Sequence, residues 1–371
     1  MSRRGLKIGG RLDRYVATLF VSSYATAFFL VVGLFLILDM ASNLDEHVET
    51  WKDGTHAPTL LILRFYVLSI PFLFLQVAPF VTLVAGLFTA VKLLRYNEVI
   101  AALSAGVSSR RLLAPVFVGG ALCGVGMFEL RELVGSSIAR QRDSVKYILQ
   151  EKQYDVVYEE LWLRDLNGSV VHLKEFRPAS GSRPAEARGL QATLRSVSRW
   201  SSTQAARAVY ETRNGRLGWW LDGGTRQEVR GEHRREPIEV LEGFDFDPEL
   251  AVTFHRARQN PMELTFSEAR ELARRDPDSV VYATLLQYHV TFPLANLVLL
   301  LVGLPALMRS RRGKAIEGMA AGCMLCIFYF AADFVLTNLG LQGGMDPYLA
   351  AWLPALFFGS VGLVLLESME S

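Results

Sequence analysis

Six long stretches of this chain carry almost no charged residue, and they limit its possible folds more than any other feature. Three precede and three follow a polar middle, at residues 16–38, 65–91, 112–128, 290–308, 318–340 and 347–366. An α-helix rises about 1.5 Å per residue, so about 20 apolar residues cross a hydrocarbon layer about 30 Å thick. The pattern predicts an α-helical membrane protein with six transmembrane helices in a three-plus-three arrangement.

The polar middle, residues 135–277, has the composition of a domain that faces water, since it is rich in Arg, Glu, Asp, Gly and Ser. Short alternating segments such as residues 161–164 and 170–173 flank a Gly-containing turn, which predicts antiparallel strands. At roughly 140 residues the segment is long enough to bury its own core. We therefore expect an all-β, jelly-roll-like domain between an N-terminal membrane half, residues 1–134, and a C-terminal membrane half, residues 278–371.

Lys and Arg gather at alternate ends of the apolar stretches. They precede the first stretch (Arg3, Arg4, Lys7, Arg11, Arg14), separate the second from the third (Lys92, Arg95, Arg110, Arg111) and separate the fourth from the fifth (Arg309, Arg311, Arg312, Lys314). Short loops rich in Lys and Arg stay in the cytoplasm, whereas long domains cross the membrane largely regardless of charge. Both termini are therefore expected inside and the middle domain outside. The formal net charge of +2 gives no reason to expect a nucleic-acid partner.

The sequence contains no motif of an enzyme or of a metal site. It has no P-loop, no nucleophile elbow and no zinc-type spacing of His and Cys. Cys323 and Cys326 do form a Cys-x-x-Cys pair, for which a redox or metal role is the alternative reading. Small polarizable residues are, however, ordinary packing residues between membrane helices. We expect a non-enzymatic protein that binds no cofactor and no metal.

The loop between the second and third stretches contains the string NEVIAALSAG, residues 97–106, which predicts a short helix. Asn97 can cap this helix, and Glu98 lies in the first turn, where the helix dipole favours an anion. Gly106 can end it, because glycine readily adopts the left-handed conformation that follows a helix.

Val99, Ile100 and Leu103 give the predicted helix an apolar face. A helix this short has little reason to expose such a face to water, so a groove in a partner protein is one way to cover it. The alternative is an interfacial helix that lies on lipid headgroups.

Several short motifs, in order along nearly the whole chain, resemble one family. They are Leu12-Asp13-Arg14-Tyr15, Glu98 with Ala105-Gly106, Leu161-Trp162-Leu163-Arg164, Tyr288-His289, Phe292-Pro293-Leu294-Ala295, Leu301-Val302-Gly303-Leu304-Pro305, Arg311-Arg312-Gly313 and Trp352-Leu353-Pro354. Each motif is weak alone, but together at this spacing they resemble the lipopolysaccharide export permeases of the LptF/LptG (YjgP/YjgQ) family.

The resemblance implies a permease subunit of an ABC transporter in the bacterial inner membrane, with its middle domain in the periplasm. ATP would be hydrolysed by a cytoplasmic ABC ATPase dimer, and this chain would bind no cofactor. Paired with a second LptF/LptG-type permease, it would take lipopolysaccharide from the outer leaflet between the first span of one subunit and the fifth span of the other. The lipid would then pass to periplasmic LptC/LptA-like bridge proteins.

The resemblance also assigns roles in the loop helix. Glu98 would couple the permease to the ATPase, with Val99, Ile100 and Leu103 filling the ATPase groove and Gly106 ending the helix.

Candidates for the cavity or gate are Asp333, Lys52 and Arg64. Asp333 interrupts the fifth stretch, and an ionised Asp costs about 2.5–3.5 kcal/mol at the bilayer centre, so we expect it to face the cavity or a partner. The alternative places Asp333 close enough to the outer end to reach headgroup water. Lys52 and Arg64 are the cations beyond the acidic outer end of the first span, and phosphate recognition requires cations.

Two other functions are compatible with the residues. One is an ABC-type permease for another lipid or for a lipoprotein, which would keep Glu98 and the ATPase. The other is a membrane-anchored binding or scaffold protein without transport.

Overall fold

The computed structural model describes residues 10–48, 58–135, 138–151, 155–180, 183–195, 200–228, 235–309 and 315–369. The chain divides into two compact units. The helical unit comprises Met1–Leu44, Ser69–Val134 and Thr284–Ser371, and the sheet unit comprises Asp45–Leu68 and Gly135–Ala283.

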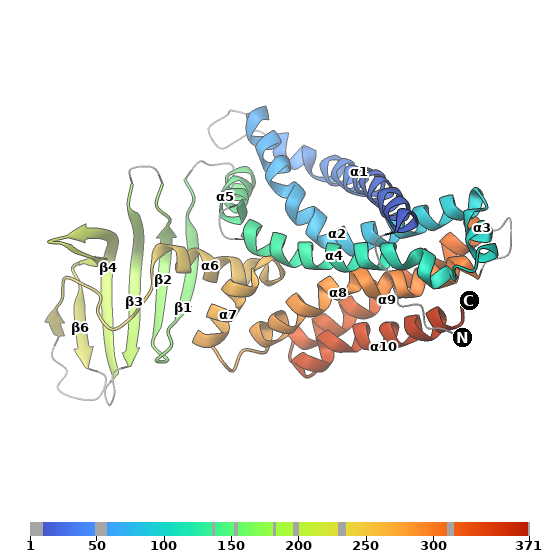
Figure 1. Cartoon of the computed structure of the whole chain (residues 1–371). Coiled ribbons are helices and arrows are strands. Elements are labelled where there is room, and N and C mark those ends of the chain that lie inside the picture. The colour runs from blue at the N-terminus through green and yellow to red at the C-terminus, as the bar shows by residue number, and fades with distance from the viewer. Residues whose placement is uncertain are drawn as a thin grey trace. The chain divides into compact units, whose positions relative to one another are not determined.

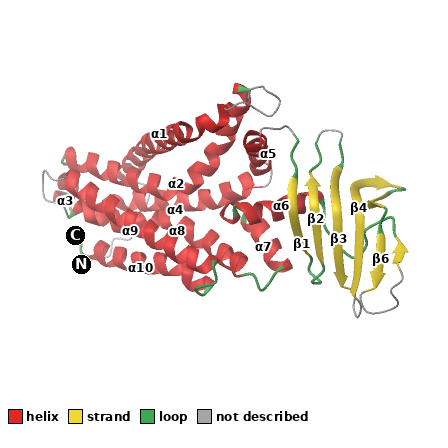
Figure 2. Cartoon of the chain, turned by 180° about the vertical axis from the view of Figure 1, so that it is seen from behind, coloured by secondary structure: helices red, strands yellow, loops and turns green. Residues whose placement is uncertain are grey.

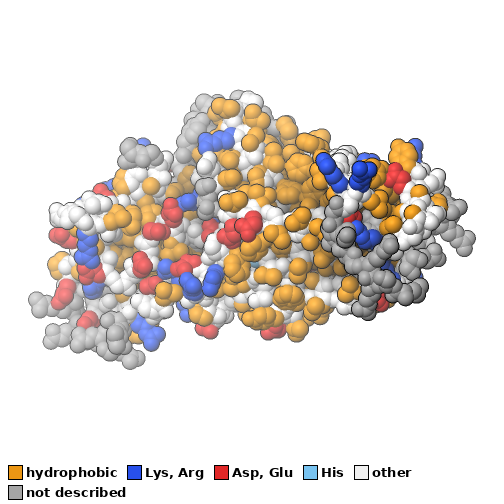
Figure 3. Space-filling view, viewed as in Figure 1, with side chains coloured by type: hydrophobic (Ala, Val, Ile, Leu, Met, Phe, Trp, Pro, Cys, Tyr) orange, Lys and Arg blue, Asp and Glu red, His pale blue; other side chains and the backbone are white. Residues whose placement is uncertain are grey.

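Six of the described helices are long and apolar enough to cross a membrane, which confirms the predicted three-plus-three arrangement (Figure 1). They are α1 (Arg11–Val48), α2 (Thr59–Arg95), α4 (Ser109–Gly135), α8 (Val280–Met308), α9 (Ala315–Leu341) and α10 (Pro347–Glu367). Each extends beyond its apolar stretch, because polar residues continue the helix past the hydrophobic segment. Figure 3 shows hydrophobic side chains over the middle of the helical unit and charged side chains gathered on the sheet unit.

Small and polar residues bring α2, α4 and α8 close together inside the helical unit. Gly124 of α4 lies against α8, and a Cβ added there would lie 2.7 Å from the carbonyl oxygen of Pro293. Buried Thr82 of α2 hydrogen-bonds the side-chain oxygen of Asn296 of α8 at 2.6 Å, and the amide of Asn296 donates to Pro293 O at 2.9 Å. Small residues and interhelical hydrogen bonds of this kind hold membrane helices together.

Gly124→Val is therefore expected to destabilise the helical unit. Because the added side chain meets backbone, α4 must move away from α8, and overpacking of this kind costs about 1–3 kcal/mol. Gly126→Val is the matched control, since a Cβ at Gly126 of the same helix meets no atom within 4 Å. Thermal unfolding of the detergent-purified chain measures both variants. Equal midpoints for the two would contradict the close approach of α4 and α8.

The sheet unit contains a single antiparallel sheet (Figure 2). Its strands are β1 (Tyr158–Arg164), β2 (Val170–Arg177), β3 (Ala185–Arg195), β4 (Trp200–Arg213), β5 (Arg216–Asp222), β6 (Thr225–Glu228) and β7 (Arg235–Pro237). The order is β1-β2-β3-β4-β6-β7, with β5 also paired to β4. The long strand β4 pairs with β6 along its first half, where Ser201 faces Glu228, and with β5 along its second half. The antiparallel β-sheet predicted for the insert is confirmed, but the insert is not all-β, because helices are packed with the sheet.

One face of the sheet carries the core of this unit. Leu161 and Leu163 of β1 and Leu173 of β2 are buried in it, as is Trp219 of β5. Trp219 stacks on Phe246 with ring centroids 4.9 Å apart, next to helix α6 (Pro248–Gln259). The unit also contains α5 (Ile138–Glu151), η1 (Pro261–Glu263) and α7 (Phe266–Arg275). Neither α5 nor α6 is predicted by the strand pattern of the sequence.

Candidate functional site

The predicted loop helix exists as α3 (Glu98–Ser104), which is shorter than residues 97–106. The expected cap is wrong: Asn97 makes no side-chain capping hydrogen bond, and its backbone is left-handed, with φ 58°. Asn tolerates this conformation better than most residues, and here it lets the chain leave α2 and enter α3. Gly106 follows the last turn with φ 81° and donates to the carbonyl of Leu103 at 2.9 Å.

The apolar side chains of α3 divide between two faces. Val99 is only 4% exposed and packs in the same core cluster as Val16 and Leu112. Ile100 and Leu103 are each 37% exposed. The structure therefore buries Val99 inside the helical unit and leaves Ile100 and Leu103 on the surface.

Glu98 is held in place by the first helix. The hydroxyl of Tyr15 donates to Glu98 Oε1 at 2.8 Å. Two residues before Tyr15, Asp13 accepts hydrogen bonds on both carboxylate oxygens from the guanidinium of Arg111, at the start of α4, at 2.6 and 2.8 Å. Arg110 donates to the carbonyl of Glu367, so the end of α10 lies at the same end of the unit (Figure 1).

This arrangement has the chemistry of a docking site. A carboxylate and two exposed aliphatic side chains lie together on a short surface helix, a combination that suits an apolar groove with a cationic rim. No cluster of His, Cys, Asp and Glu that could hold a metal occurs in the part of the chain that the structure describes. Tyr15, Asp13 and Arg111 are the residues that sequence reasoning missed. Asp13 and Tyr15 belong to the Leu12-Asp13-Arg14-Tyr15 motif, but only the structure shows which side chains they bind.

The cavity candidates lie in different places. Asp333 of α9 is 6% exposed and lies inside the helical unit. It is thus enclosed by its own chain in the single permease subunit. Arg64, near the start of α2, belongs to the sheet unit, is exposed and donates to Gln141 Oε1 at 3.3 Å. Lys52 lies outside the described residues.

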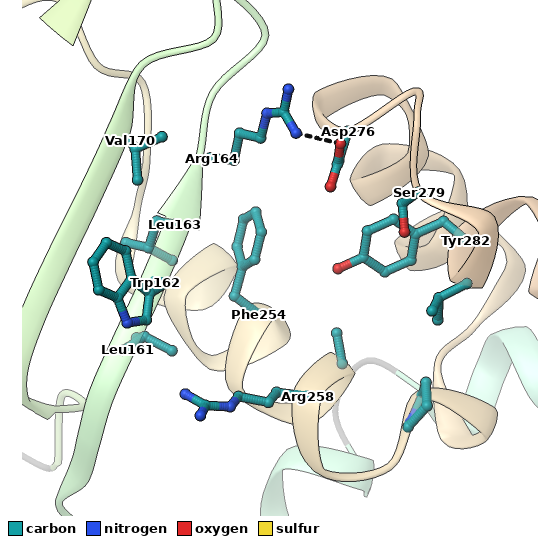
Figure 4. Close-up of a pocket in the computed structure, with 13 residues that line it drawn as sticks. Leu161, Trp162, Leu163, Arg164, Val170, Phe254, Arg258, Asp276, Ser279 and Tyr282 are labelled. Atoms are coloured by element: carbon teal, nitrogen blue, oxygen red, sulfur yellow. Dashed lines mark hydrogen bonds and ion pairs between the residues drawn. The ribbon is translucent and has the colours of Figure 1, made fainter. Parts of the chain in front are cut away.

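The sheet unit has a cleft of about 550 Å³ beside its edge strand β1 (Figure 4). Phe254 of α6 points into it between the strand and Tyr282. Its arginines already have partners, since Arg164 pairs with Asp276 and Arg258 donates to the carbonyl of Glu160 at 2.9 Å. The cleft therefore offers an apolar wall more than an anion site.

Comparison with known proteins identifies one family. The sequence model described as "Lipopolysaccharide export system permease LptF/LptG" matches residues 14–368. The match includes α3, all strands of the sheet and, except for a few terminal residues, all six spans. No curated protein matches the chain.

Proposed function

Since the chain belongs to the LptF/LptG family of lipopolysaccharide export permeases, we propose that it extracts lipopolysaccharide from the outer leaflet of the bacterial inner membrane and passes it to a periplasmic bridge of LptC/LptA-like proteins. Members of this family are multi-pass permease subunits of the lipopolysaccharide export ABC transporter and lack ATPase activity. The observation that carries the proposal is the match over residues 14–368, which includes both membrane halves and the inserted sheet.

In the proposed transporter, α3 receives force from a cytoplasmic ABC ATPase dimer. Glu98 would bind a cationic group of the ATPase, and Ile100 and Leu103 would fill its groove. Val99 would fix α3 to the permease core, because it is buried there. Gly106 would set the end of the helix. The exposed position of Ile100 and Leu103 supports this division of roles.

The proposed orientation has both termini in the cytoplasm and the sheet unit in the periplasm. It is supported by Lys92, Arg95, Arg110 and Arg111, which flank α3 in short loops or adjacent helix ends. ATP hydrolysis and lipid transfer would then occur on opposite sides of the membrane.

A second LptF/LptG-type permease would complete the lipid cavity. Large apolar side chains on α1 and α9, among them Phe29 and Phe334, are exposed in this chain. Such surfaces require lipid or a partner helix, which supports the entry of lipopolysaccharide between α1 of one subunit and α9 of the other. Lys52 and Arg64 are proposed as phosphate contacts, and buried Asp333 of α9 as a cavity or gate residue.

Purification of the chain with a second permease and the ABC ATPase tests this function. The chain should retain the ATPase in detergent, and mass spectrometry of the bound lipid should show lipopolysaccharide. Reconstituted into proteoliposomes, the complex should release lipopolysaccharide to an LptA-like acceptor only when ATP is hydrolysed. Failure to retain the ATPase with Glu98 intact would reject the transporter, and a different bound lipid would reject the cargo.

A further inference from the structure

We infer that Tyr15, supported by the Asp13–Arg111 ion pair, is a positioning residue that fixes the ATPase-coupling carboxylate of Glu98 to the first turn of α1 and so transmits movement of α3 to that helix. This inference rests on the proposed function. It names Tyr15 as the residue through which the coupling helix α3 acts on α1, a proposed wall of the lipid cavity.

The first observation is the geometry of Glu98. Among the described residues only its Oε1 atom has a hydrogen-bond partner, the hydroxyl of Tyr15 at 2.8 Å. Its other oxygen accepts no hydrogen bond from the described part of the chain, so a donor from the ATPase can bind there. A carboxylate can accept from several donors at once, so Glu98 can stay bound to α1 while it binds a cation of the ATPase.

The second observation is the way α3 joins its neighbours. Residues with left-handed backbone lie on both sides of it, Asn97 with φ 58° and Gly106 with φ 81°. These two residues interrupt the helical path from α2 through α3 to α4, and such positions absorb changes of backbone angle when elements move. The side-chain bond from Glu98 to Tyr15 is a link that does not pass through either of them.

The third observation is a second connection at the same turn of α1. Asp13 lies two residues before Tyr15 and accepts two hydrogen bonds from Arg111, two residues after the first residue of α4. Asp13 is buried. A bidentate Arg–carboxylate pair fixes orientation as well as distance. The beginning of α4 and the beginning of α3 are thus both bound to one turn of α1.

Apolar packing also links these two segments. Val16 follows Tyr15 and Val99 follows Glu98, and both valines are buried in one core cluster. A displacement of α3 that kept both contacts would carry the first turn of α1 with it, and α1 is a proposed wall of the lipid cavity.

Tyr15→Phe tests the inference in the complete complex with ATPase and second permease. The variant keeps the ring and loses only the hydroxyl. We expect lipopolysaccharide released per ATP hydrolysed to fall roughly threefold to tenfold, the range that corresponds to the net contribution of one typical hydrogen bond at a partly exposed site. ATP turnover, complex assembly and thermal midpoint should stay as in wild type. Tyr348→Phe, at an exposed tyrosine in the first turn of α10, is the matched control and should match wild type.

A distance measurement separates transmission from a purely structural role. Spin labels at Phe29→Cys of α1 and Val125→Cys of α4, in a background without native cysteines, report the separation of these helices with and without ATP. Both positions are exposed. We expect an ATP-dependent distance change in the wild-type background and its loss in Tyr15→Phe.

Three results would overturn the inference: an unchanged release per ATP, an unchanged distance response, or a fall in assembly and ATP turnover together. Arg111→Lys provides a second test, because it keeps the charge and loses the bidentate geometry, and it should lower release per ATP in the same direction. If the wild-type chain retains no ATPase, the proposed function itself fails, which is distinguishable from these outcomes.

Discussion

Replacement of Glu98 by alanine is expected to abolish most lipid release while the ATPase continues to hydrolyse ATP. Truncating one partner of a charge pair at an interface costs about 2–5 kcal/mol, which corresponds to a loss of coupling of at least about thirtyfold. The fold should survive, because Glu98 is on a surface helix and Val99 still holds α3 in the core. The measurement is lipopolysaccharide transferred to an acceptor per ATP hydrolysed, in proteoliposomes that contain the complete complex.

Leu103→Asp should give the same uncoupling through a different contact. Leu103 is 37% exposed, so a carboxylate there stays in water in the free permease but has to enter an apolar groove in the complex. An unpaired charge buried in this way is strongly unfavourable. Leu166→Asp is the matched control, since Leu166 is also an exposed leucine and lies in a turn of the sheet unit. Wild-type transport by both Glu98→Ala and Leu103→Asp would remove the basis for assigning coupling to α3.

The six membrane-spanning helices were predictable because the hydropathy of the sequence alone determines them. A lipid-exposed helix needs a continuous apolar stretch of a fixed length, and each of the six stretches became one helix. The position of α3 was also predictable from the spacing of Glu98, Leu103 and Gly106. The capping of α3 was not predictable. The sequence predicts that the side chain of Asn97 caps the helix, whereas its backbone forms a left-handed turn before the helix.

Residues that act through distant partners could not be predicted. Tyr15 meets Glu98 across 83 positions, and Asp13 meets Arg111 across 98. Nothing in a single sequence records such pairs. Helix α5 was missed for a different reason: its buried residues Ala139, Arg142, Val145 and Leu149 follow helical spacing, but one of them is an arginine, which breaks the apolar pattern.

Buried arginines of this kind join the helices of the sheet unit. Arg256 of α6 is 5% exposed and binds Asp143 of α5 at 3.0 Å and Glu268 of α7 at 2.6 Å. Glu268 also completes the capping box of α7 with Thr265. Arg142 binds Asp143 as well, at 2.7 Å. One guanidinium therefore connects α6 and its neighbour α7 with α5, which lies far from both in the sequence.

The surroundings of Arg256 penalise an unpaired charge. Burial lowers the pKa of the neighbouring His255 below its ordinary value, although Asp143 acts in the opposite direction. At this position the free-energy cost of removing water from the charged imidazolium of His255 therefore exceeds its attraction to the carboxylate of Asp143. Glu268 should experience the same environment once its guanidinium partner Arg256 is gone, whereas Asp143 keeps its pair with Arg142.

Arg256→Ala is accordingly expected to destabilise α5, α6 and α7 by about 3–5 kcal/mol, the cost of breaking a buried ion pair from one side. Arg183→Ala is the matched control: Arg183 is 79% exposed, its pair with Asp155 spans 3.4 Å, and surface pairs are worth about 0–1 kcal/mol. Hydrogen exchange of the purified chain measures the helices individually, which matters because a protein of two units has no single unfolding free energy. Equal protection of α6 in the two variants would show that Arg256 is solvated and that apolar packing alone holds these helices on the sheet. Loss of protection confined to α5, α6 and α7 would instead establish that the guanidinium connects them.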